Sequence, residues 1–142
     1  MDLTEHVEGL VHEPTQVGER GLDLTVDAVY RVTGPGRVDF GGGELEAAER
    51  EPVATEQRDP DDDYGWWTLS GDVYLVAFNE RLSAPADRAF VLQTRDAVRA
   101  RGAFHPTLHL AGDDALEAVP LAVGDGGIAV KENARLSTLL PG

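Results

Sequence analysis

The side chains of this chain that could do chemistry are mainly carboxylates and arginines. Cysteine is absent, which excludes thiolate nucleophiles, disulfides and zinc–thiolate sites. Only three serines occur, Ser70, Ser83 and Ser137, and none stands in the Gly-x-Ser-x-Gly pattern of a nucleophile elbow. The chemistry that remains open is acid–base catalysis by carboxylates and anion binding by arginines.

Two groups of possible metal ligands have unsuitable spacing. His105 and His109 are four residues apart, but Pro106 and the neighbouring apolar residues favour a strand, in which four residues span about 13 Å and cannot share one ion. The acidic run Asp59–Asp63 lacks the glycine and the distal glutamate of a calcium-binding loop. We therefore predict no metal site made by the protein alone, and we interpret the acidic run as part of a solvated loop.

The charge balance is strongly acidic. The chain has 26 acidic and 12 basic side chains, a net charge of −14, and Lys131 is its only lysine. This composition is typical of halophilic proteins, since molar salt shortens the Debye length to about 3 Å and screens self-repulsion. We expect the fold to lose stability as salt is lowered. The same charge argues against nucleic-acid binding, which needs a basic surface.

Targeting and membrane signals are not apparent in the sequence. The N-terminal segment MDLTEHVEGLVHE is acidic and has no long apolar core. No run approaches the roughly 20 apolar residues that span a bilayer. We therefore expect a cytoplasmic protein without a membrane partner.

Alternating apolar residues predict many short strands and little helix. Short helices are expected over 3–11 and over 94–101, the second capped by Thr94 and ended by Gly102. Residues 44–63 are expected to form an acidic loop. The pattern indicates one all-β domain over residues 1–142, a sandwich or a barrel. The expected strands are 22–32, 66–69, 73–78, 89–93, 104–110, 118–123, 128–130 and 135–140.

The segment 66–85, WWTLSGDVYLVAFNERLSAP, is the most informative stretch. Its two apolar runs flank Ser70-Gly71-Asp72 and predict a hairpin with a tight turn. The second run, Val73–Phe78, is apolar on both faces, which predicts burial on both sides, as in a sandwich, a barrel or a subunit interface. The order Trp-x-Leu, turn, Tyr-Leu-Val, Asn-Glu and x-Pro resembles the central hairpin of the archaeal dUTPase and dCTP deaminase superfamily.

The resemblance covers most of the chain, from about Gln16 to Leu140. It implies a dUTPase-like distorted barrel or sandwich of many short strands with one short helix. It also implies a homotrimer with sites in the clefts between subunits, a deoxynucleoside triphosphate as ligand, and Mg²⁺ bridging the triphosphate if the site is active.

Two of the family's motifs are largely kept. Gln16 followed by Gly21-Leu22-Asp23-Leu24-Thr25 resembles the first motif, whose aspartate helps to organise the metal–triphosphate neighbourhood. Arg135 matches the arginine of the fourth motif, Gly-x-Arg-Ile-x-Gln-Leu, although Thr138 replaces its glutamine. The resemblance thus implies nucleotide-binding roles for Asp23 and Arg135. From the residues alone, Asp23 would be interpreted as an exposed strand residue.

The second motif is altered at its phosphate-binding residues. In the family, Pro-Arg-Ser-Ser opens a short helix whose N-terminus and hydroxyl meet phosphate oxygens. Here Arg95 is kept, while Asp96 and Ala97 replace both serines. A carboxylate in the first turn favours the helix but repels a triphosphate. The resemblance therefore places Arg95 and Asp96 at the nucleotide site, with Asp96 opposing phosphate binding.

The third motif, a hairpin resembling Trp-Asp-x-Gly-Tyr, supplies the aspartate that activates the attacking water. Its aligned position falls on Leu110 or Ala111, and no tyrosine follows. Asp113 or Asp114 could act as a relocated catalytic base only if the hairpin register had shifted, because a slip of one residue turns a side chain to the opposite face. The alternative is that this pair simply forms an Asx-type turn.

Three functional hypotheses follow. The leading one is a dUTPase or dCTP deaminase-like scaffold, a divergent trimeric paralogue with weakened or lost catalysis. The second is an active dUTP diphosphatase that uses Asp113 or Asp114 as its base and Mg²⁺ on the triphosphate. The third is a structural or regulatory trimer that binds a protein partner.

Overall fold

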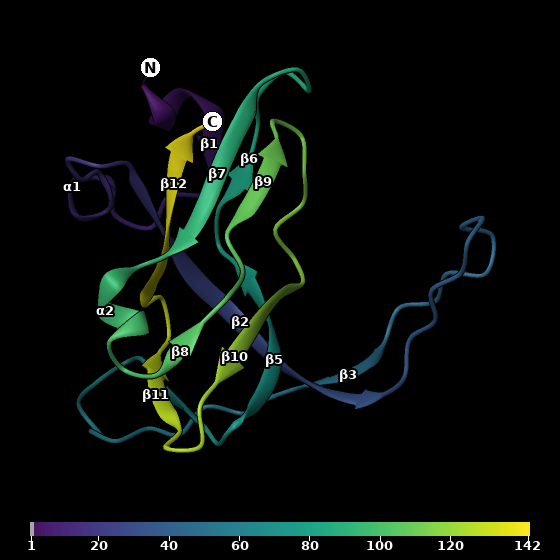
Figure 1. The fold of residues 1–142 in the computed structure, drawn as a ribbon. Coiled ribbons are helices and arrows are strands. Elements are labelled where there is room, and N and C mark those ends of the chain that lie inside the picture. Colours follow the sequence, from purple (N-terminus) through teal and green to yellow (C-terminus); the bar gives the residue numbers. More distant parts are fainter. Residues whose placement is uncertain (1) are drawn as a thin grey trace.

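The protein is built from short strands around one curled sheet, as the computed structural model of residues 2–142 shows (Figure 1). The elements, in chain order, are η1 (Leu3–His6), β1 (Val7–Glu8), α1 (Glu13–Gln16), β2 (Leu22–Gly34), β3 (Glu49–Pro52), β4 (Trp66–Leu69), β5 (Asp72–Phe78), β6 (Arg81–Leu82), β7 (Ala89–Thr94), α2 (Asp96–Arg99), β8 (Ala103–Phe104), β9 (Leu108–Ala111), β10 (Val119–Val123), β11 (Ile128–Lys131) and β12 (Arg135–Pro141). No helix among these residues is long and apolar enough to cross a membrane.

The long sheet has eight antiparallel strands. Seven strands follow the order β8-β10-β5-β2-β12-β7-β9, and the eighth, β3, pairs with the far end of β2. β2 pairs with β12 through its first residues and with β5 through its later ones, and a register shift between Val26 and Ala28 marks the change of partner. Two further pairs, β1 with β6 and β4 with β11, complete the fold. The predicted all-β architecture is confirmed.

The core follows from strand alternation, which turns every second side chain inward. In β2, Leu22, Leu24 and Val26 are buried, and in β5 the inward residues are Tyr74 and Val76. The outer face of β5 is only partly covered within one chain, because Val73 is 49% exposed. The expected two-sided burial of 73–78 is therefore incomplete in the single chain.

The predicted hairpin of 66–78 is wrong. β4 pairs with β11 and β5 pairs with β2 and β10, so the two strands enter different sheets. Ser70 and Gly71 form a corner, where the Tyr74 hydroxyl donates to the Ser70 carbonyl at 2.9 Å. Apolar patterning identified both strands but could not show that each strand has a distant partner.

Four other expectations need correction. The helix over 3–11 is a single 3₁₀ turn, η1, after which Val7 pairs with Leu82. The helix over 94–101 is limited to α2, and Arg95 occupies the N-cap position in place of Thr94. The strand over 104–110 is divided into β8 and β9 around Pro106. The loop over 44–63 contains β3, whose residues are all exposed and show no alternation.

A long two-stranded arm leaves the body of the protein. We define the arm as residues 32–52, the end of β2, the connection that follows and β3. Figure 1 shows it projecting away from the rest of the fold. β2 and β3 pair over residues 30–34 and 49–52, and beyond them Arg37 and Glu46 form one isolated bridge.

Candidate functional site

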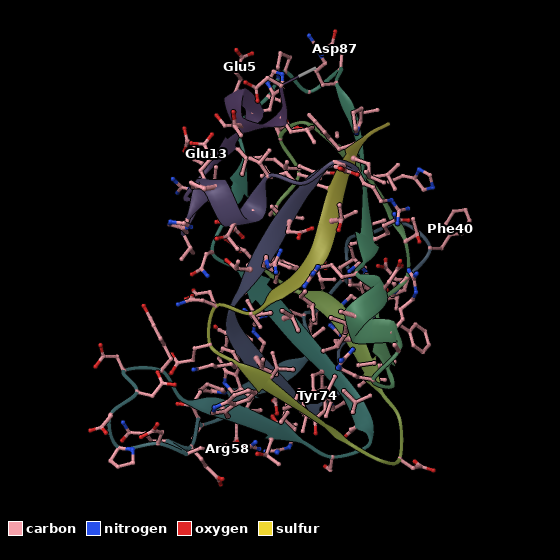
Figure 2. The ribbon with its side chains drawn as sticks, turned by 90° about the vertical axis from the view of Figure 1, so that its left-hand side faces the viewer. Glu5, Glu13, Phe40, Arg58, Tyr74 and Asp87 are labelled. Carbon is pink, nitrogen blue, oxygen red and sulfur yellow. The ribbon has the colours of Figure 1, made fainter. Side chains whose placement is uncertain are left out.

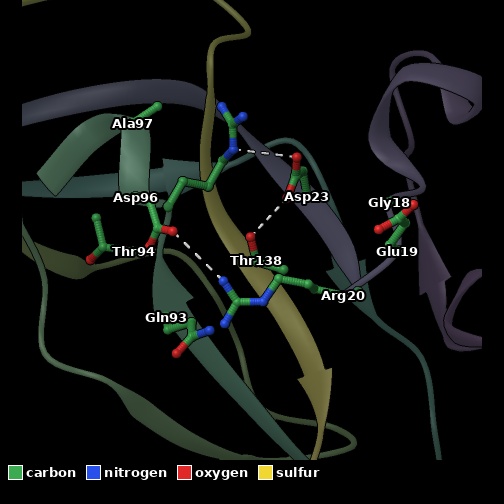
Figure 3. Close-up of a pocket in the computed structure, with 11 residues that line it drawn as sticks. Gly18, Glu19, Arg20, Asp23, Gln93, Thr94, Asp96, Ala97 and Thr138 are labelled. Atoms are coloured by element: carbon green, nitrogen blue, oxygen red, sulfur yellow. Dashed lines mark hydrogen bonds and ion pairs between the residues drawn. The ribbon is translucent and has the colours of Figure 1, made fainter. Parts of the chain in front are cut away.

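A cleft of about 340 Å³ lies where β2, β7 and β12 meet α2 (Figure 3). We call it the Asp23 cleft; it is lined by residues 18–21, Asp23, residues 93–97 and Thr138. The sheet register brings these distant segments together, because Thr138 of β12 pairs with Asp23 of β2 on one side and with Gln93 of β7 on the other. Gly21 is needed in the wall, since a Cβ there would collide with the Leu139 carbonyl.

The Asp23 carboxylate lies between two arginines. Its Oδ2 is 3.3 Å from Arg95 Nε and 3.1 Å from Arg135 Nη1, and its Oδ1 accepts a hydrogen bond from Thr138 Oγ1 at 2.8 Å. Arg95 also donates to the Arg135 carbonyl at 3.0 Å. The structure thus brings together three of the residues that the sequence placed at the nucleotide site, Asp23, Arg95 and Arg135.

The fourth of these residues, Asp96, opens α2 at the edge of the same cleft. Its carboxylate is 70% exposed, pairs with Arg99 one turn along the helix and lies 3.7 Å from Arg20 (Figure 3). Thr94 does not cap this helix, because its hydroxyl accepts from the His105 amide at 2.9 Å. The entrance of the cleft therefore carries an exposed negative charge beside the positive charge of Arg20.

Asp113 and Asp114 do not lie in the Asp23 cleft of the same chain. They line a different cavity, of about 460 Å³, together with Asp27, Arg50 and Glu117. The Asp114 amide donates to the Ala111 carbonyl at 3.1 Å, and Asp114 Oδ2 accepts from the Ala111 amide at 2.8 Å. Residues 111–114 therefore form a backbone turn, but not the predicted Asx-type turn, in which the carboxylate accepts from a later amide. Both aspartates are exposed.

A buried polar network behind the cleft was missed by the sequence analysis. Glu80 is buried and accepts hydrogen bonds from the Thr25 amide at 2.8 Å, from Thr25 Oγ1 at 2.6 Å and from Gln16 Nε2 at 2.9 Å. Gln16 Nε2 also donates to the Asp23 carbonyl at 2.9 Å. The network therefore holds the backbone that carries Asp23. The signal available in the sequence was the Asn79-Glu80 pair directly after an apolar strand.

A second missed feature is a buried serine–histidine pair. His105 Nε2 lies 2.6 Å from Ser137 Oγ, and His105 Nδ1 lies 2.7 Å from the Pro106 carbonyl. A carbonyl only accepts, so Nδ1 carries the proton and Nε2 accepts from the serine hydroxyl. Burial lowers the pKa of His105. Both side chains are shielded from solvent, so the pair holds the residue after β8 to β12 and offers no nucleophile to a substrate.

The cleft does not provide a complete site for a metal ion. Among residues 2–142, no three His, Cys, Asp or Glu side chains come together as ligands. Both oxygens of Asp23 are already engaged by Thr138 and the two arginines. Mg²⁺ is commonly held by one or two carboxylates together with substrate phosphates. These residues therefore fit magnesium only as the companion of a bound triphosphate.

Comparison with known proteins places the chain in a family. No protein-family model matches it. A probable deoxyuridine 5'-triphosphate nucleotidohydrolase of Methanosarcina acetivorans is 32% identical over 146 residues, covering 99% of this chain and 80% of the relative. The chain belongs to the dUTPase family. A dUTPase relative of the same description from Archaeoglobus fulgidus is 33% identical, with 94% of this chain and 78% of the relative covered.

Other dUTPase-family comparisons agree in fold. A relative of the same description from Halobacterium salinarum is 31% identical over 96 residues, which cover 68% of this chain and 55% of the relative. The 2'-deoxycytidine 5'-triphosphate deaminase of Agrobacterium tumefaciens superposes with a TM-score of 0.59 at 15% identity, over 96% of this chain and 43% of that one. The resemblance to the dUTPase and dCTP deaminase superfamily is confirmed, and so is the dUTPase-like fold.

Proposed function

We propose that this chain is a divergent dUTPase-family paralogue that binds a deoxynucleoside triphosphate in the Asp23 cleft and hydrolyses it weakly or not at all. The observation that carries the proposal is the charge arrangement of the cleft. Arg95 and Arg135 remain there as phosphate-binding cations, but Asp23 offsets part of their charge, and Asp96 adds an exposed carboxylate where the family has a hydroxyl. Binding survives in this arrangement, but it is weakened.

The proposal extends to assembly and cofactor. A homotrimer would set the Asp23 cleft of one chain against a neighbouring chain and would cover the half-exposed outer face of β5. Magnesium would enter with the triphosphate, whose charge it reduces. Light scattering at molar salt tests the assembly, and a clean monomer there would contradict both the trimer and the shared cleft.

Weak hydrolysis is expected because Leu110 and Ala111 stand where the family has its water-activating aspartate. Both belong to β9, and neither side chain can take a proton. The second candidate function, an active dUTP diphosphatase, is favoured by one observation, the exposed carboxylate of Asp113 in a cavity of its own. A third candidate, a structural or regulatory trimer, needs no ligand in either cavity.

Asp96→Ser separates these candidates. Calorimetry should show tighter dUTP binding, by about two- to fivefold at low salt and less at molar salt, because removing an exposed charge has a screened effect. The matched control is Asp125→Ser, which removes the same charge from an exposed turn that does not line the cleft and should leave dUTP binding unchanged. Hydrolysis should stay low in Asp96→Ser and should appear only after Leu110→Asp or Ala111→Asp is added.

Turnover of dUTP and dCTP by pure protein, with Mg²⁺ in molar salt, completes the test. Brisk hydrolysis by the wild type that is abolished by Asp113→Asn with Asp114→Asn would establish the relocated-base enzyme. Absence of deoxynucleotide binding in both the wild type and Asp96→Ser would leave the structural or regulatory trimer.

A further inference from the structure

The arm exposes apolar side chains at its far end. Among residues 2–142, the exposed large apolar side chains number nine, and four of them, Val32, Val38, Phe40 and Leu45, belong to the arm. Val38 is 90% exposed and the Phe40 ring is fully exposed. Figure 2 shows Phe40 pointing away from the body, at the outline of the molecule. Such a concentration of apolar surface on one projection indicates a contact with another molecule.

The arm has little to hold it in place in the single chain. An isolated two-stranded ribbon is marginally stable in water at best. The connection at its far end contains Gly41-Gly42-Gly43, and Asp39 Oδ1 is shielded there without a hydrogen-bond partner. Added strands are not the expected partners, because the outer strand β3 reads Glu49-Arg50-Glu51-Pro52, and charge and proline protect a sheet edge from pairing. The contact is therefore expected to use the side chains of the far end.

A suitable receptor surface exists on the same protein. An apolar hollow of about 200 Å³ lies between α2 and β11, and we call it the α2–β11 hollow. Its apolar walls include Val98, Ile128 and Ala129, and its cationic side chains are Arg101, Lys131 and Arg135. Lys131 pairs with Asp62 and Arg135 pairs with Asp23. Arg101 donates to the Ala97 carbonyl and pairs with no carboxylate among residues 2–142, so it is the cation that the hollow offers to a partner.

The arm matches this hollow in both apolar character and charge. Asp39 and Glu44 stand beside the apolar residues of its far end, while Glu46 is paired with Arg37 within the arm. An acidic, apolar projection meeting a cationic, apolar hollow gives the complementarity that orients protein interfaces. The same acids disfavour insertion into a membrane, whose cytoplasmic surface is negatively charged.

The arm does not reach the hollow of its own chain. Figure 1 shows the arm leaving on the side of the body opposite α2 and β11. The last residue of β2 that pairs with the body is Arg31, and the nine residues from there to Phe40 span at most about 30 Å. A compact chain of this length has a radius of gyration of about 14 Å, so that reach is enough to contact a neighbouring copy.

We propose that the arm of one copy docks its Val38–Phe40 segment into the α2–β11 hollow of a second copy of this chain. The contact joins two different surfaces, so it is heterologous and closes into a ring when repeated around a threefold axis. Ala97 and Arg135 connect the hollow to the Asp23 cleft, so the docked arm lies beside the nucleotide cleft of its neighbour. The arm is thereby a clamp between subunits.

Light scattering in molar salt tests the clamp. Val38→Asp with Phe40→Asp should convert the wild-type trimer to monomer at equal protein concentration, with little change in the thermal midpoint, because these side chains are almost fully exposed in their own chain. Val11→Asp, a change at another half-exposed apolar residue, is the matched control and should leave the trimer intact. Arg101→Glu should weaken the trimer, and Glu44→Arg in the same chain should restore part of it.

The absence of cysteine allows a direct test of which surfaces meet. Phe40→Cys with Ala129→Cys should give covalent trimers on a non-reducing gel after oxidation, whereas Phe40→Cys with Val11→Cys should give none. A monomeric wild type, a trimer unaffected by the aspartate variants, or a disulfide formed within one chain would each overturn the proposal. These outcomes do not depend on nucleotide binding, which calorimetry with dUTP measures separately.

Discussion

Two carboxylates near the start of β2, those of Asp23 and Glu80, differ in the charge of the groups that contact them. Asp23, in the cleft, meets the guanidinium groups of Arg95 and Arg135 and the Thr138 hydroxyl. Glu80, behind the cleft, meets no cation and accepts only from the neutral donors of Thr25 and Gln16. Asp23 keeps some contact with solvent at 14% side-chain exposure, whereas Glu80 is 1% exposed.

The difference separates exchangeable from permanent interactions. Arginine binds phosphate in the same forked geometry that it uses for a carboxylate, so a triphosphate can compete with Asp23 for its partners. The donors around Glu80 are buried, so water does not replace the carboxylate when it is lost. Gln16 joins the two regions, because its amide nitrogen donates both to Glu80 and to the Asp23 carbonyl. The permanent network thus supports the exchangeable one.

The largest effect is expected for Glu80→Ala. This change removes the acceptor of three buried hydrogen bonds, of whose donors only Gln16 Nε2 keeps a second acceptor, and should lower the free energy of unfolding by about 3 kcal/mol or more. Glu80→Gln should cost less, because its amide oxygen keeps one acceptor. Denaturant unfolding in molar salt measures both. The control is Glu8→Ala, which removes an exposed carboxylate that pairs with Arg81 and should lower the free energy of unfolding by less than about 1 kcal/mol. Equal losses of stability in Glu80→Ala and Glu8→Ala would contradict the permanent role of Glu80.

A smaller and salt-dependent effect is expected for Asp23→Asn. The variant leaves Arg95 and Arg135 without their shared anion, and the loss of stability should be about 1 kcal/mol at low salt and less in molar salt, where partly exposed charges are screened. Inorganic pyrophosphate should bind more tightly, because both arginines are freed. Calorimetry measures this, and weaker binding would show that Asp23 orders the arginines for phosphate instead of competing with it.

The smallest effect concerns pH. Burial lowers the pKa of His105 below its usual value of 6.5. Below pH 6.5, His105 therefore binds a proton in the unfolded chain but not yet in the folded chain. Stability should therefore fall as pH decreases from 6.5 toward the lowered pKa. His105→Asn should reduce the difference between thermal midpoints at pH 7 and pH 5.5, while the exposed His109→Asn should not. An unchanged difference in both variants would assign the acid sensitivity to other groups.

Periodicity predicted the strands well where burial alternates. Leu22, Leu24 and Val26 identified β2, and β10 to β12 lie within one or two residues of the expected ranges. β3 was not predicted, because Glu49–Pro52 is exposed on all sides and carries no apolar signal. The hairpin at Ser70–Asp72 failed because a local turn pattern contains no information about strands that pair from 60 residues away.

In the candidate site too, contacts between residues far apart in sequence were the hardest to predict. The resemblance placed Asp23, Arg95 and Arg135 together, since conserved motifs carry information about distant contacts. The Glu80 network was missed, although Gln16, Thr25 and Glu80 all lie in segments that carry the resemblance. Its hydrogen bonds join residues 55 and 64 positions apart, and Asn79-Glu80-Arg81 was interpreted only as the polar end of a strand. Long-range polar contacts leave no periodic trace in a sequence.

The position of β12 has a consequence for how the chain folds. This strand, the last in the sequence, lies between β2 and β7, and it pairs Thr138 with Asp23 across 115 residues. Strand pairings between residues so far apart in sequence form slowly, because the entropy of closing a long loop is lost before any contact stabilises the pair. During synthesis the sheet therefore stays divided into two unjoined halves until residues 135–141 have left the ribosome. Its nascent β2 and β7 edges are then exposed to aggregation.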